Sequence, residues 1–341
     1  MSRTIDLHQH VIPDFYWQAS NEDGNAAGGI NPPRWSLDSA IAYLDAAEID
    51  VAVPSISTPG VHFGDDAAAR TLARRVNEYL AEIRRDRSDR FGGFAALPLP
   101  DVEGSLEALA YALDVLNLDG VSLMTNAGGS YLGDTRFDPI FAELQRRAAL
   151  VFVHPTASPD PIAHSLGLPD ALLDYPVDTS RAIAKLHYSN TFARTPDVKY
   201  VFSHAGGTVP YLASRFGIVD AMDVIAGADE RGSFADTATR LYWDTASAFS
   251  DPVLRLLRSG DRPAERRVRD RLPVSARRDL DRRAADAATH GRALRRGARG
   301  RARRHRVAVD YSAVTVSAAA RCAERSRPAR SSAAAPSSRI A

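Results

Sequence analysis

Short runs of apolar, largely β-branched and aromatic residues recur along the chain up to about residue 258, and each precedes a longer stretch with helical spacing. This alternation is typical of repeated strand–helix units that build a parallel sheet. Seven runs are expected to be strands, at residues 4–7, 51–56, 91–97, 120–124, 150–153, 199–202 and 241–243. No Gly-x-Gly-x-x-Gly follows the first run, so within the α/β class the pattern favours a (β/α)8 TIM barrel over a doubly wound sheet.

The alternation ends near residue 258, where the composition of the chain changes. Residues 1–258 hold 21 Lys and Arg against 34 Asp and Glu, whereas residues 259–341 hold 22 Arg and no Lys against 8 Asp and Glu. A segment with few apolar residues and high charge of one sign cannot bury enough surface to offset the entropy lost on ordering. We therefore predict an incomplete barrel over residues 1–258. A disordered, Arg/Ala-rich, low-complexity tail over residues 259–341 is expected to replace the eighth strand and the C-terminal helices.

The remaining bulk properties exclude several classes of protein. The single cysteine, Cys322, excludes an internal disulfide framework and fits a reducing compartment. No apolar run is long enough for a signal peptide or a membrane span, so a soluble cytoplasmic protein without a membrane partner is expected. The basic tail is compatible with a nucleic-acid-binding arm, but it has almost no aromatic residues and no nucleic-acid-binding motif. No nucleic-acid partner is therefore expected.

Histidines stand where three of the expected strands end. His8 and His10 follow the first strand, His154 follows the fifth, and His204 follows the sixth. The C-terminal ends of the strands line the active-site mouth of a TIM barrel, so these four imidazoles are expected to converge on one pocket. Any one of them alone would most often be a structural residue, but four at matching positions make coincidence a poor explanation. Several neutral imidazoles together suit a divalent metal such as Zn²⁺.

Other polar and aromatic residues have less specific interpretations. Asp244 ends the seventh strand and is expected either to support a metal ligand by a hydrogen bond, which is favoured, or to bind metal directly. Three further histidines are expected on loop or helix surfaces: His62, His164 and His187. Four side chains are expected either to shape an aromatic pocket or simply to pack: Trp17, Phe63, Asn126 and Tyr131.

Five short motifs carry a resemblance to a known family: Asp-Leu-His-Gln-His, Ser-Ile-Ser-Thr-Pro-Gly-Val-His-Phe, Leu-Pro-Leu-Pro-Asp, Val-Phe-Val-His-Pro and Ser-His-Ala-Gly-Gly. Together they resemble the amidohydrolase-related (amidohydrolase 2) family over about residues 3–258. Within it they are most similar to the branch of aminocarboxymuconate-semialdehyde, salicylate and resorcylate decarboxylases, that of 6-methylsalicylate in particular. Each motif alone is weakly specific, whereas the set is specific.

The resemblance implies a site and a reaction. His8, His10 and His154 match the family's metal ligands, and His204 matches a histidine that acts near the substrate as acid or base. The implied cofactor is a divalent metal, zinc first and manganese second. The implied reaction is the non-oxidative decarboxylation of a small aromatic or muconate-type carboxylic acid, and the implied assembly is a homodimer.

Two alternatives to this function stay open. The same ligands would serve a metal-dependent hydrolase of a lactone or an amide. A catalytically impaired barrel is the other alternative, because the family's remaining ligand has no match in this sequence. That ligand is an aspartate after the eighth strand, in the motif Phe-Gly-[Ser/Thr]-Asp-[Tyr/Phe]-Pro.

A shifted reading frame would explain the missing motif. Residues 268–275, Val-Arg-Asp-Arg-Leu-Pro-Val-Ser, can be encoded by GTT CGG GAC CGA CTT CCC GTA TCT, followed by the G of an alanine codon. Read one base later, this DNA encodes Phe-Gly-Thr-Asp-Phe-Pro-Tyr-Leu, which contains the motif. We therefore hypothesise a frameshift between about residues 257 and 268, with out-of-frame sequence after it. A genuine divergent tail is the alternative.

Overall fold

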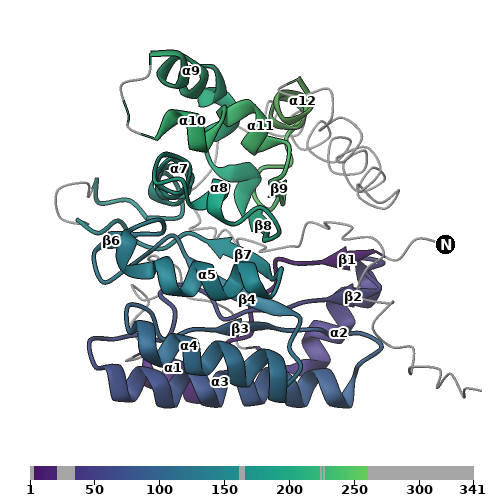
Figure 1. Ribbon diagram of the computed structural model, residues 1–341. Helices are drawn as coiled ribbons and strands as arrows, with labels where there is room; N and C mark the ends of the chain where they lie inside the picture. The colour runs from purple at the N-terminus through teal and green to yellow at the C-terminus, as the bar shows by residue number, and fades with distance from the viewer. Residues whose placement is uncertain (1–3, 21–34, 161–165, 223–224, 226, 260–341) are drawn as a thin grey trace, which may run out of the picture.

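The fold is built from parallel strands that follow one another in chain order (Figure 1). The computed structural model describes residues 4–20, 35–160, 166–222, 225 and 227–259. The strands that match the predicted ones are β1 (Ile5–Asp6), β2 (Val51–Ala52), β3 (Phe94–Ala96), β4 (Gly120–Met124), β7 (Leu150–His154), β8 (Lys199–Phe202) and β9 (Tyr242–Trp243). Strands β3, β4, β7, β8 and β9 form one parallel sheet, β1 pairs with β2, and a bridge from Ala52 to Phe91 joins the two sheets. All seven predicted strands are confirmed.

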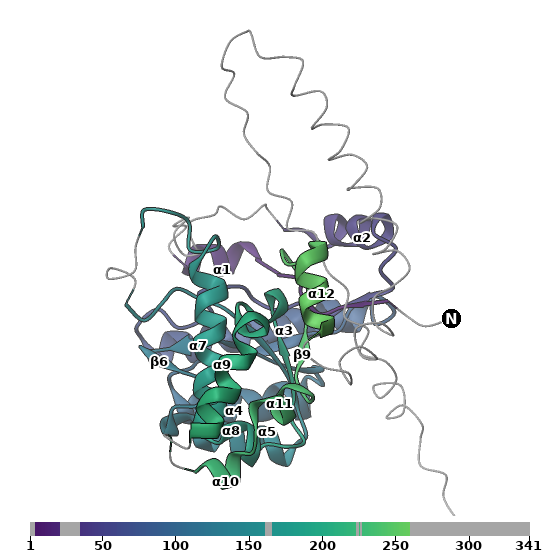
Figure 2. The same ribbon diagram turned by 90° about the horizontal axis from the view of Figure 1, so that it is seen from above.

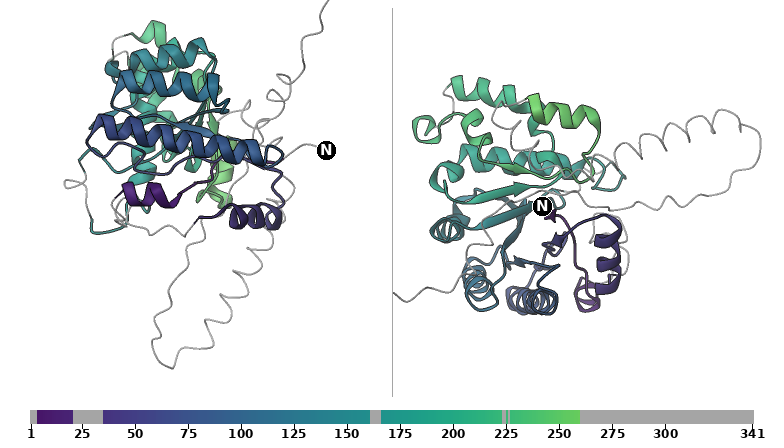
Figure 3. Two further views of the ribbon diagram at one scale, coloured as in Figure 1. Left: turned by 90° about the horizontal axis from the view of Figure 1, so that it is seen from below. Right: turned by 90° about the vertical axis from the view of Figure 1, so that its right-hand side faces the viewer.

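These strands curve into a barrel instead of spreading as an open sheet. One buried cluster collects side chains from along the whole strand order: Leu7, Val53, Phe94, Phe152 and Val201. Leu7 follows β1 and Val201 lies in β8, so only a sheet that curls toward closure brings both into one core. Helices surround the strands in the right-hand view of Figure 3. The predicted TIM-barrel fold is confirmed, whereas the predicted loss of the eighth strand and C-terminal helices concerns residues 260–341, outside the described part.

Most helices begin and end close to their predicted positions. Helix α2 (Leu37–Ala46) starts after Ser36, whose Oγ accepts a hydrogen bond from Ser39 N at 3.2 Å, so the predicted N-cap is confirmed. The other helices that match predicted ones are α3 (Asp66–Asp86), α4 (Val102–Ala110) with a π-helical turn at Tyr111–Val115, α5 (Asp138–Arg146), α9 (Val209–Met222) and α12 (Asp251–Ser259). Within the described residues, no helix is both long enough and apolar enough to cross a membrane.

One predicted helix is in fact two helices. The single helix predicted from about residue 179 to residue 195 is replaced by α7 (Asp174–Tyr188) and α8 (Thr191–Arg194). Asn190 stands between them with φ of 61°, the left-handed conformation that ends many helices and that asparagine adopts more readily than most residues. The helical spacing of apolar residues continues across this break, so the sequence pattern did not reveal it.

Several short elements were not predicted. They are a 3-10 turn at Thr135–Phe137, another at His204–Gly206, α1 (Asp14–Ala19), α10 (Ala228–Arg231), α11 (Phe234–Ala238), and an antiparallel hairpin of β5 (Asn126–Ala127) and β6 (Ser130–Tyr131). Gly128 and Gly129 form the hairpin turn with φ of 55° and 79°, which glycine adopts without steric cost. A Gly-Gly pair is a known hairpin signal, so the sequence did contain the information for this turn.

Helix α12 packs beside the last strand, β9 (Figure 2). Its Leu254 and Leu257 form a buried cluster with Ala205, and Trp243 of β9 packs against this cluster. The apolar face of α12 is therefore buried next to the strand end that carries His204, which explains why this helix forms at the end of the described chain.

His187 is buried, so its predicted surface position is wrong. Only 1 % of its surface is exposed, and its Nε2 lies 3.2 Å from Asp220 Oδ1 on α9. Its ring also packs edge-on against Phe234 at 5.2 Å between ring centroids. Burial lowers the pKa of His187, and the hydrogen bond that its Nε2–H donates to Asp220 only partly opposes this shift. His164, also predicted on the surface, lies outside the described residues.

Acid is expected to destabilise the fold partly through His187. A histidine with a lowered pKa in the folded state takes up its proton more readily in the unfolded chain. The contribution of His187 to stability is therefore complete above the pKa of a histidine in the unfolded chain, about 6.5. It is lost as the pH falls from there toward the lower pKa of His187 in the folded protein. We expect the thermal unfolding midpoint of His187→Gln to fall less than that of the wild type when the pH is lowered from about 7.5 to about 5. Thermal unfolding of both proteins measures this difference, and equal losses would contradict it.

Gly120→Ala is expected to lower the free energy of unfolding by about 1–3 kcal/mol. A Cβ at Gly120 would collide with the carbonyl oxygen of Leu150 and lie 3.0 Å from its Cβ, at the contact between β4 and β7. Gly217→Ala on α9 is the matched control, because nothing lies within 4 Å of a Cβ built there. Alanine favours a helix over glycine by about 0.5–1 kcal/mol, so the control should be stabilised. Chemical denaturation of both variants tests this, and an undiminished stability of Gly120→Ala would contradict the packing argument.

Candidate metal centre and active site

Four histidines meet at the C-terminal ends of the strands. His8 and His10 follow β1, His154 ends β7, and His204 follows β8. The ring centroids of His10 and His154 are 4.7 Å apart, those of His8 and His204 are 5.1 Å apart, and those of His154 and His204 are 5.7 Å apart. The structure therefore brings together all four residues that the sequence predicted to converge, and we call them the histidine cluster.

Three members of the histidine cluster have the geometry of a metal site. The ligand atoms of His8, His10 and His154 lie within 4.8 Å of one another, and the Nε2 atoms of His8 and His10 are 3.2 Å apart. Burial, reinforced by the charge of His8, lowers the pKa of His10 and of His154 well below the ordinary value. Neutral imidazoles keep a free lone pair, which is the form that binds a metal. Three convergent nitrogen donors fit a divalent cation such as zinc.

A buried nitrogen without a hydrogen-bond partner supports a ligand at this site. Among the described residues of the histidine cluster, Nδ1 of His204 is buried and has no partner. Leaving a buried polar atom unpaired costs free energy, so such an atom in a native site usually indicates a ligand, an ion or a water. At His204 a substrate or a water would supply the missing partner.

Asp244 contacts both His8 and the backbone of His204. It follows β9, is fully buried, and its Oδ2 lies 2.6 Å from His8 Nδ1. Its Oδ1 accepts hydrogen bonds from the backbone amides of His204 at 2.7 Å and Ala246 at 3.0 Å. Because Nδ1–H of His8 donates to this carboxylate, Nε2 is the His8 nitrogen that faces His10 and is left to bind a cation. Of the two interpretations of Asp244, this geometry favours a hydrogen bond that orients a ligand.

The Asp244 carboxylate also sets the protonation of His8. Burial alone would lower the pKa of His8, but the charge of Asp244 and its hydrogen bond outweigh burial and raise the pKa. A cation bound at Nε2 would take the place of the second imidazole proton, so metal binding and proton release are coupled here.

Asp6 is a further buried acid close to the histidine cluster, and its role was not predicted from the sequence. Its Oδ1 accepts a hydrogen bond from His8 N at 2.9 Å, which fixes the turn of the chain between β1 and the first two histidines. Burial raises the pKa of Asp6 to about 6, although the His8 amide opposes the shift. An aspartate inside an apolar strand was the sequence signal for such a buried position.

His204 is presented by a strained stretch of backbone. His204, Ala205, Gly206 and Gly207 all have positive φ, at 53°, 58°, 72° and 66°. Positive φ is unfavourable for histidine and alanine, and it persists where the surrounding contacts over-determine it. A side chain at Gly206 would collide with the Trp243 ring and one at Gly207 with the Pro176 carbonyl. Burial, with the charge of His8, lowers the pKa of His204 to about 4, so its imidazole is neutral near neutral pH.

A second buried acid holds the hairpin beside the site. Asp178 on α7 accepts hydrogen bonds from Tyr131 OH at 2.6 Å, from Asn126 Nδ2 at 3.0 Å and from the Thr125 hydroxyl. Burial raises the pKa of Asp178, and these three donors oppose the shift. Tyr131 therefore anchors the hairpin to α7 and is not among the residues that line the cavity described next, whereas Asn126 is.

A cavity of about 150 Å³ lies near the histidine cluster, although none of the four histidines is among its lining residues. It lies at the C-terminal ends of β2, β3 and β4, and we call it the strand-end cavity. Two neighbour relations place it against the cluster: Met124 in its wall pairs with His154, and Ile56 in its wall follows Ser55, which pairs with His10. Trp17 and Phe63 do not line it, so neither of these two expected pocket residues is placed at the cavity by the structure.

Known proteins share this arrangement of fold and sequence. The amidohydrolase family model matches residues 5–259. The decarboxylase yanB of Aspergillus niger is 36% identical over 266 residues, which cover 74% of this chain and 72% of the relative. The 6-methylsalicylic acid decarboxylase acuB of Aspergillus aculeatus is 36% identical over 261 residues, covering 74% of this chain and 79% of the relative.

A solved structure of an amidohydrolase II agrees with the sequence comparisons. It superimposes with a TM-score of 0.70 at 27% sequence identity, covering 75% of this chain and 82% of the solved one. The family match spans almost the whole described chain and includes every member of the histidine cluster. This chain belongs to the amidohydrolase family.

Proposed function

We propose that the protein is a metal-dependent, non-oxidative decarboxylase of a small aromatic carboxylic acid. The observation that carries the proposal is the histidine cluster, in which three convergent nitrogen donors lie beside a fourth imidazole. Relatives that are 36% identical over most of their length and are named as decarboxylases support the reaction class. A cavity of about 150 Å³ near the cluster, lined in part by Leu97, Leu99 and Leu123, supports a small aromatic substrate.

In this proposal His8, His10 and His154 hold the divalent cation. Zinc is the proposed metal, because nitrogen donors in a compact site suit it, and manganese is the alternative. A bound divalent cation supplies a Lewis acid and a template for the substrate carboxylate or an adjacent hydroxyl. Asp244 keeps the Nε2 lone pair of His8 turned toward this position through the 2.6 Å contact at Nδ1.

His204 is the proposed proton carrier. Decarboxylation breaks the bond between the ring carbon and the carboxyl carbon, and the ring carbon gains a proton as CO₂ leaves. The His204 imidazole is held by the hydrogen bond from its backbone amide to Asp244, and its ring centroid lies 5.7 Å from that of His154; it can take up a proton and deliver it to that carbon.

Domain organisation, assembly and location complete the proposal. We propose that residues 1–258 form the catalytic barrel and that residues 259–341 are a separate tail. The sequence-based hypothesis of a frameshift concerns residues outside the described part. Resequencing the gene across the codons for residues 251–276 tests it, since a lost or inserted base should restore Phe-Gly-Thr-Asp-Phe-Pro in frame. The expected homodimer and cytoplasmic location remain predictions.

The proposed reaction is tested with the full chain, saturated in turn with zinc and manganese. Incubation with 2-hydroxybenzoic acids should release CO₂ and the corresponding phenol without added oxidant. Release of product from lactones or amides alone would replace the proposal by a hydrolase. A chain that binds metal tightly but turns over none of these substrates would support a catalytically impaired barrel.

A further inference from the structure

The direction of the His204 ring depends on its backbone. Its buried Nδ1 has no hydrogen-bond partner among the described residues, whereas its backbone amide donates to Asp244 Oδ1 at 2.7 Å. His204 and Ala205 both have positive φ, at 53° and 58°, a conformation that neither residue type prefers. The imidazole therefore points into the cluster only as long as the surrounding contacts keep this stretch of chain in its strained conformation.

One set of these contacts comes from the strand side. The amide of His204 donates to the side chain of Asp244, and the amide of Ala205 donates to the Asp244 carbonyl oxygen at 2.9 Å. Asp244 also contacts the metal ligand His8 at 2.6 Å. A substitution of Asp244 would therefore disturb the metal ligand and His204 together, and it cannot isolate the support of His204.

The other set comes from α7, through Ser180. Thr208, four residues after His204, donates from its backbone amide to Ser180 Oγ at 2.8 Å, and the two hydroxyl oxygens are 2.7 Å apart. Ser180 Oγ also donates to the carbonyl oxygen of Pro176 at 2.7 Å. A hydroxyl has one proton and two lone pairs, so the three contacts are compatible when the Thr208 hydroxyl donates to Ser180. The full hydrogen-bonding capacity of Ser180, which is 7 % exposed, is then used to join α7 to the loop.

The loop also packs directly on the same turn of α7. A Cβ at Gly207 would collide with the Pro176 carbonyl oxygen and lie 2.9 Å from Ser180 Oγ. The backbone therefore cannot move closer to α7, and its hydrogen bonds to Ser180 oppose movement away from the helix. Asp244 and Ser180 thus hold the two ends of residues 204–208.

We propose that Ser180 is a positioning residue that keeps His204 in the conformation needed for proton transfer. This inference rests on the proposed function, in which His204 carries the proton. Ser180 acts through the backbone of residues 204–208 and not through the metal ligands. Without its hydroxyl, Thr208 is released, φ of His204 and Ala205 relaxes toward ordinary values, and the imidazole turns away from the carbon that is to be protonated.

The kinetic test uses the metal-saturated full chain with a 2-hydroxybenzoic acid that the wild type decarboxylates. We expect Ser180→Ala to lower kcat by about 10–100-fold, because a small displacement of a proton donor is costly, while KM changes by less than about twofold. Its metal content after dialysis should equal that of the wild type. Thr208→Val should lower kcat less, since the amide of residue 208 still donates to Ser180, and it should have no further effect in the Ser180→Ala background. An unchanged kcat of Ser180→Ala would overturn the proposal.

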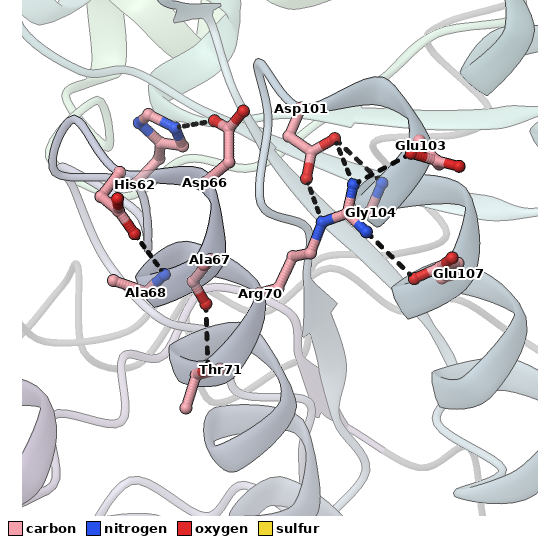
Figure 4. A network of polar contacts seen from close by, with 11 residues as sticks. His62, Asp66, Ala67, Ala68, Arg70, Thr71, Asp101, Glu103, Gly104 and Glu107 are labelled. Atoms are coloured by element: carbon pink, nitrogen blue, oxygen red, sulfur yellow. Dashed lines mark hydrogen bonds and ion pairs between the residues drawn. The ribbon is translucent and has the colours of Figure 1, made fainter.

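Two control variants make related changes away from His204. Ser105→Ala is the same substitution at a fully buried position on α4, where the serine hydroxyl has no partner among the described residues. Thr71→Ala on α3 removes a hydroxyl that donates to the carbonyl oxygen of Ala67, four residues earlier, at 2.9 Å, as Ser180 does to Pro176 (Figure 4). Both variants should keep the wild-type kcat and metal content. A loss of kcat in either control as large as that in Ser180→Ala would refute a specific role of Ser180.

Hydrogen exchange of backbone amides provides a readout that does not depend on activity. The amides of His204 and Ala205 are bonded to Asp244, so they report whether Ser180 supports the opposite end of the loop. We expect both to exchange roughly three- to tenfold faster in Ser180→Ala, the effect of losing about one hydrogen bond, and at the wild-type rate in Ser105→Ala.

The two readouts separate this inference from the proposed function. Faster exchange in Ser180→Ala in a protein that decarboxylates none of the acids would support the role of Ser180 in holding His204 and refute the decarboxylase proposal. Decarboxylation by the wild type, with unchanged exchange and kcat in Ser180→Ala, would support the reaction and refute the role of Ser180.

Discussion

Replacing His154 by alanine is expected to lower the affinity for the divalent metal by more than about 100-fold and to abolish decarboxylation. His154 is 3 % exposed, and its Nδ1 lies 2.7 Å from the carbonyl oxygen of Pro155. Its Nδ1–H therefore donates to that carbonyl, and Nε2 keeps its lone pair for a cation. Without it, two imidazole donors remain of the three convergent ones, one fewer than a catalytic zinc site normally provides.

Metal content after dialysis and competitive titration with a chelator measure this effect. His62→Ala is the matched control. His62 also lies in a loop that follows a strand, but it pairs with Asp66 and is not one of the three proposed metal ligands. The control should retain the wild-type metal content. A His154→Ala protein that retains metal as tightly as the wild type would refute the proposed ligand set, whatever its activity.

Asp244→Asn is expected to weaken metal binding by about 10–100-fold although asparagine has almost the same shape. The backbone amides of His204 and Ala246 can still donate to the Asn carbonyl oxygen, so the loop after β9 should keep its conformation. The change falls on His8, because an amide NH₂ placed 2.6 Å from Nδ1 cannot accept a proton from it. Nδ1 then becomes the acceptor, the proton moves to Nε2, and the lone pair that faces His10 is lost.

Two readouts separate this orienting role from a general structural one. Nitrogen chemical shifts of the His8 ring should report the change of tautomer, and the metal dissociation constant should rise in parallel. Asp178→Asn is the matched control, because Asp178 is also a fully buried aspartate with several hydrogen-bond donors but has no contact with the cluster. It should lose stability and keep its metal affinity. If Asp244→Asn and the wild type bind the metal with equal affinity, Asp244 does not orient His8 and only stabilises the loop that follows β9.

The barrel and its strand ends could be predicted because both depend on local pattern. Seven apolar runs become seven parallel strands in chain order, since a run of β-branched and aromatic residues between helical stretches has few other ways to bury itself. The histidines converge because each stands at the C-terminal end of a strand, and a barrel gathers those ends at one mouth. The positions of four histidines at the ends of predicted strands were therefore enough to predict that they meet: His8, His10, His154 and His204.

Contacts between distant parts of the chain could not be predicted in this way. Asp244 was expected to take part in the site, but its contact with His8 joins residues 236 positions apart, and only the closed order of strands decides which nitrogen it touches. His187 looked like a surface residue on its helix, whereas α9 and α11 bury it. The strand-end cavity is equally a tertiary feature, because its walls come from four separate segments of the chain.

The sequence by itself determined the strand–helix order, the barrel class and the four histidines at its mouth, since apolar periodicity and position along a strand are local properties. Only the tertiary structure decided which partner orients His8, why the backbone after His204 needs glycine at Gly206 against Trp243 and at Gly207 against Pro176, and where a cavity forms among the strand ends. These depend on distances between side chains that the chain brings together from far apart. Hydrogen bonds and steric contacts act only at a few ångströms, so no pattern within one segment can specify them.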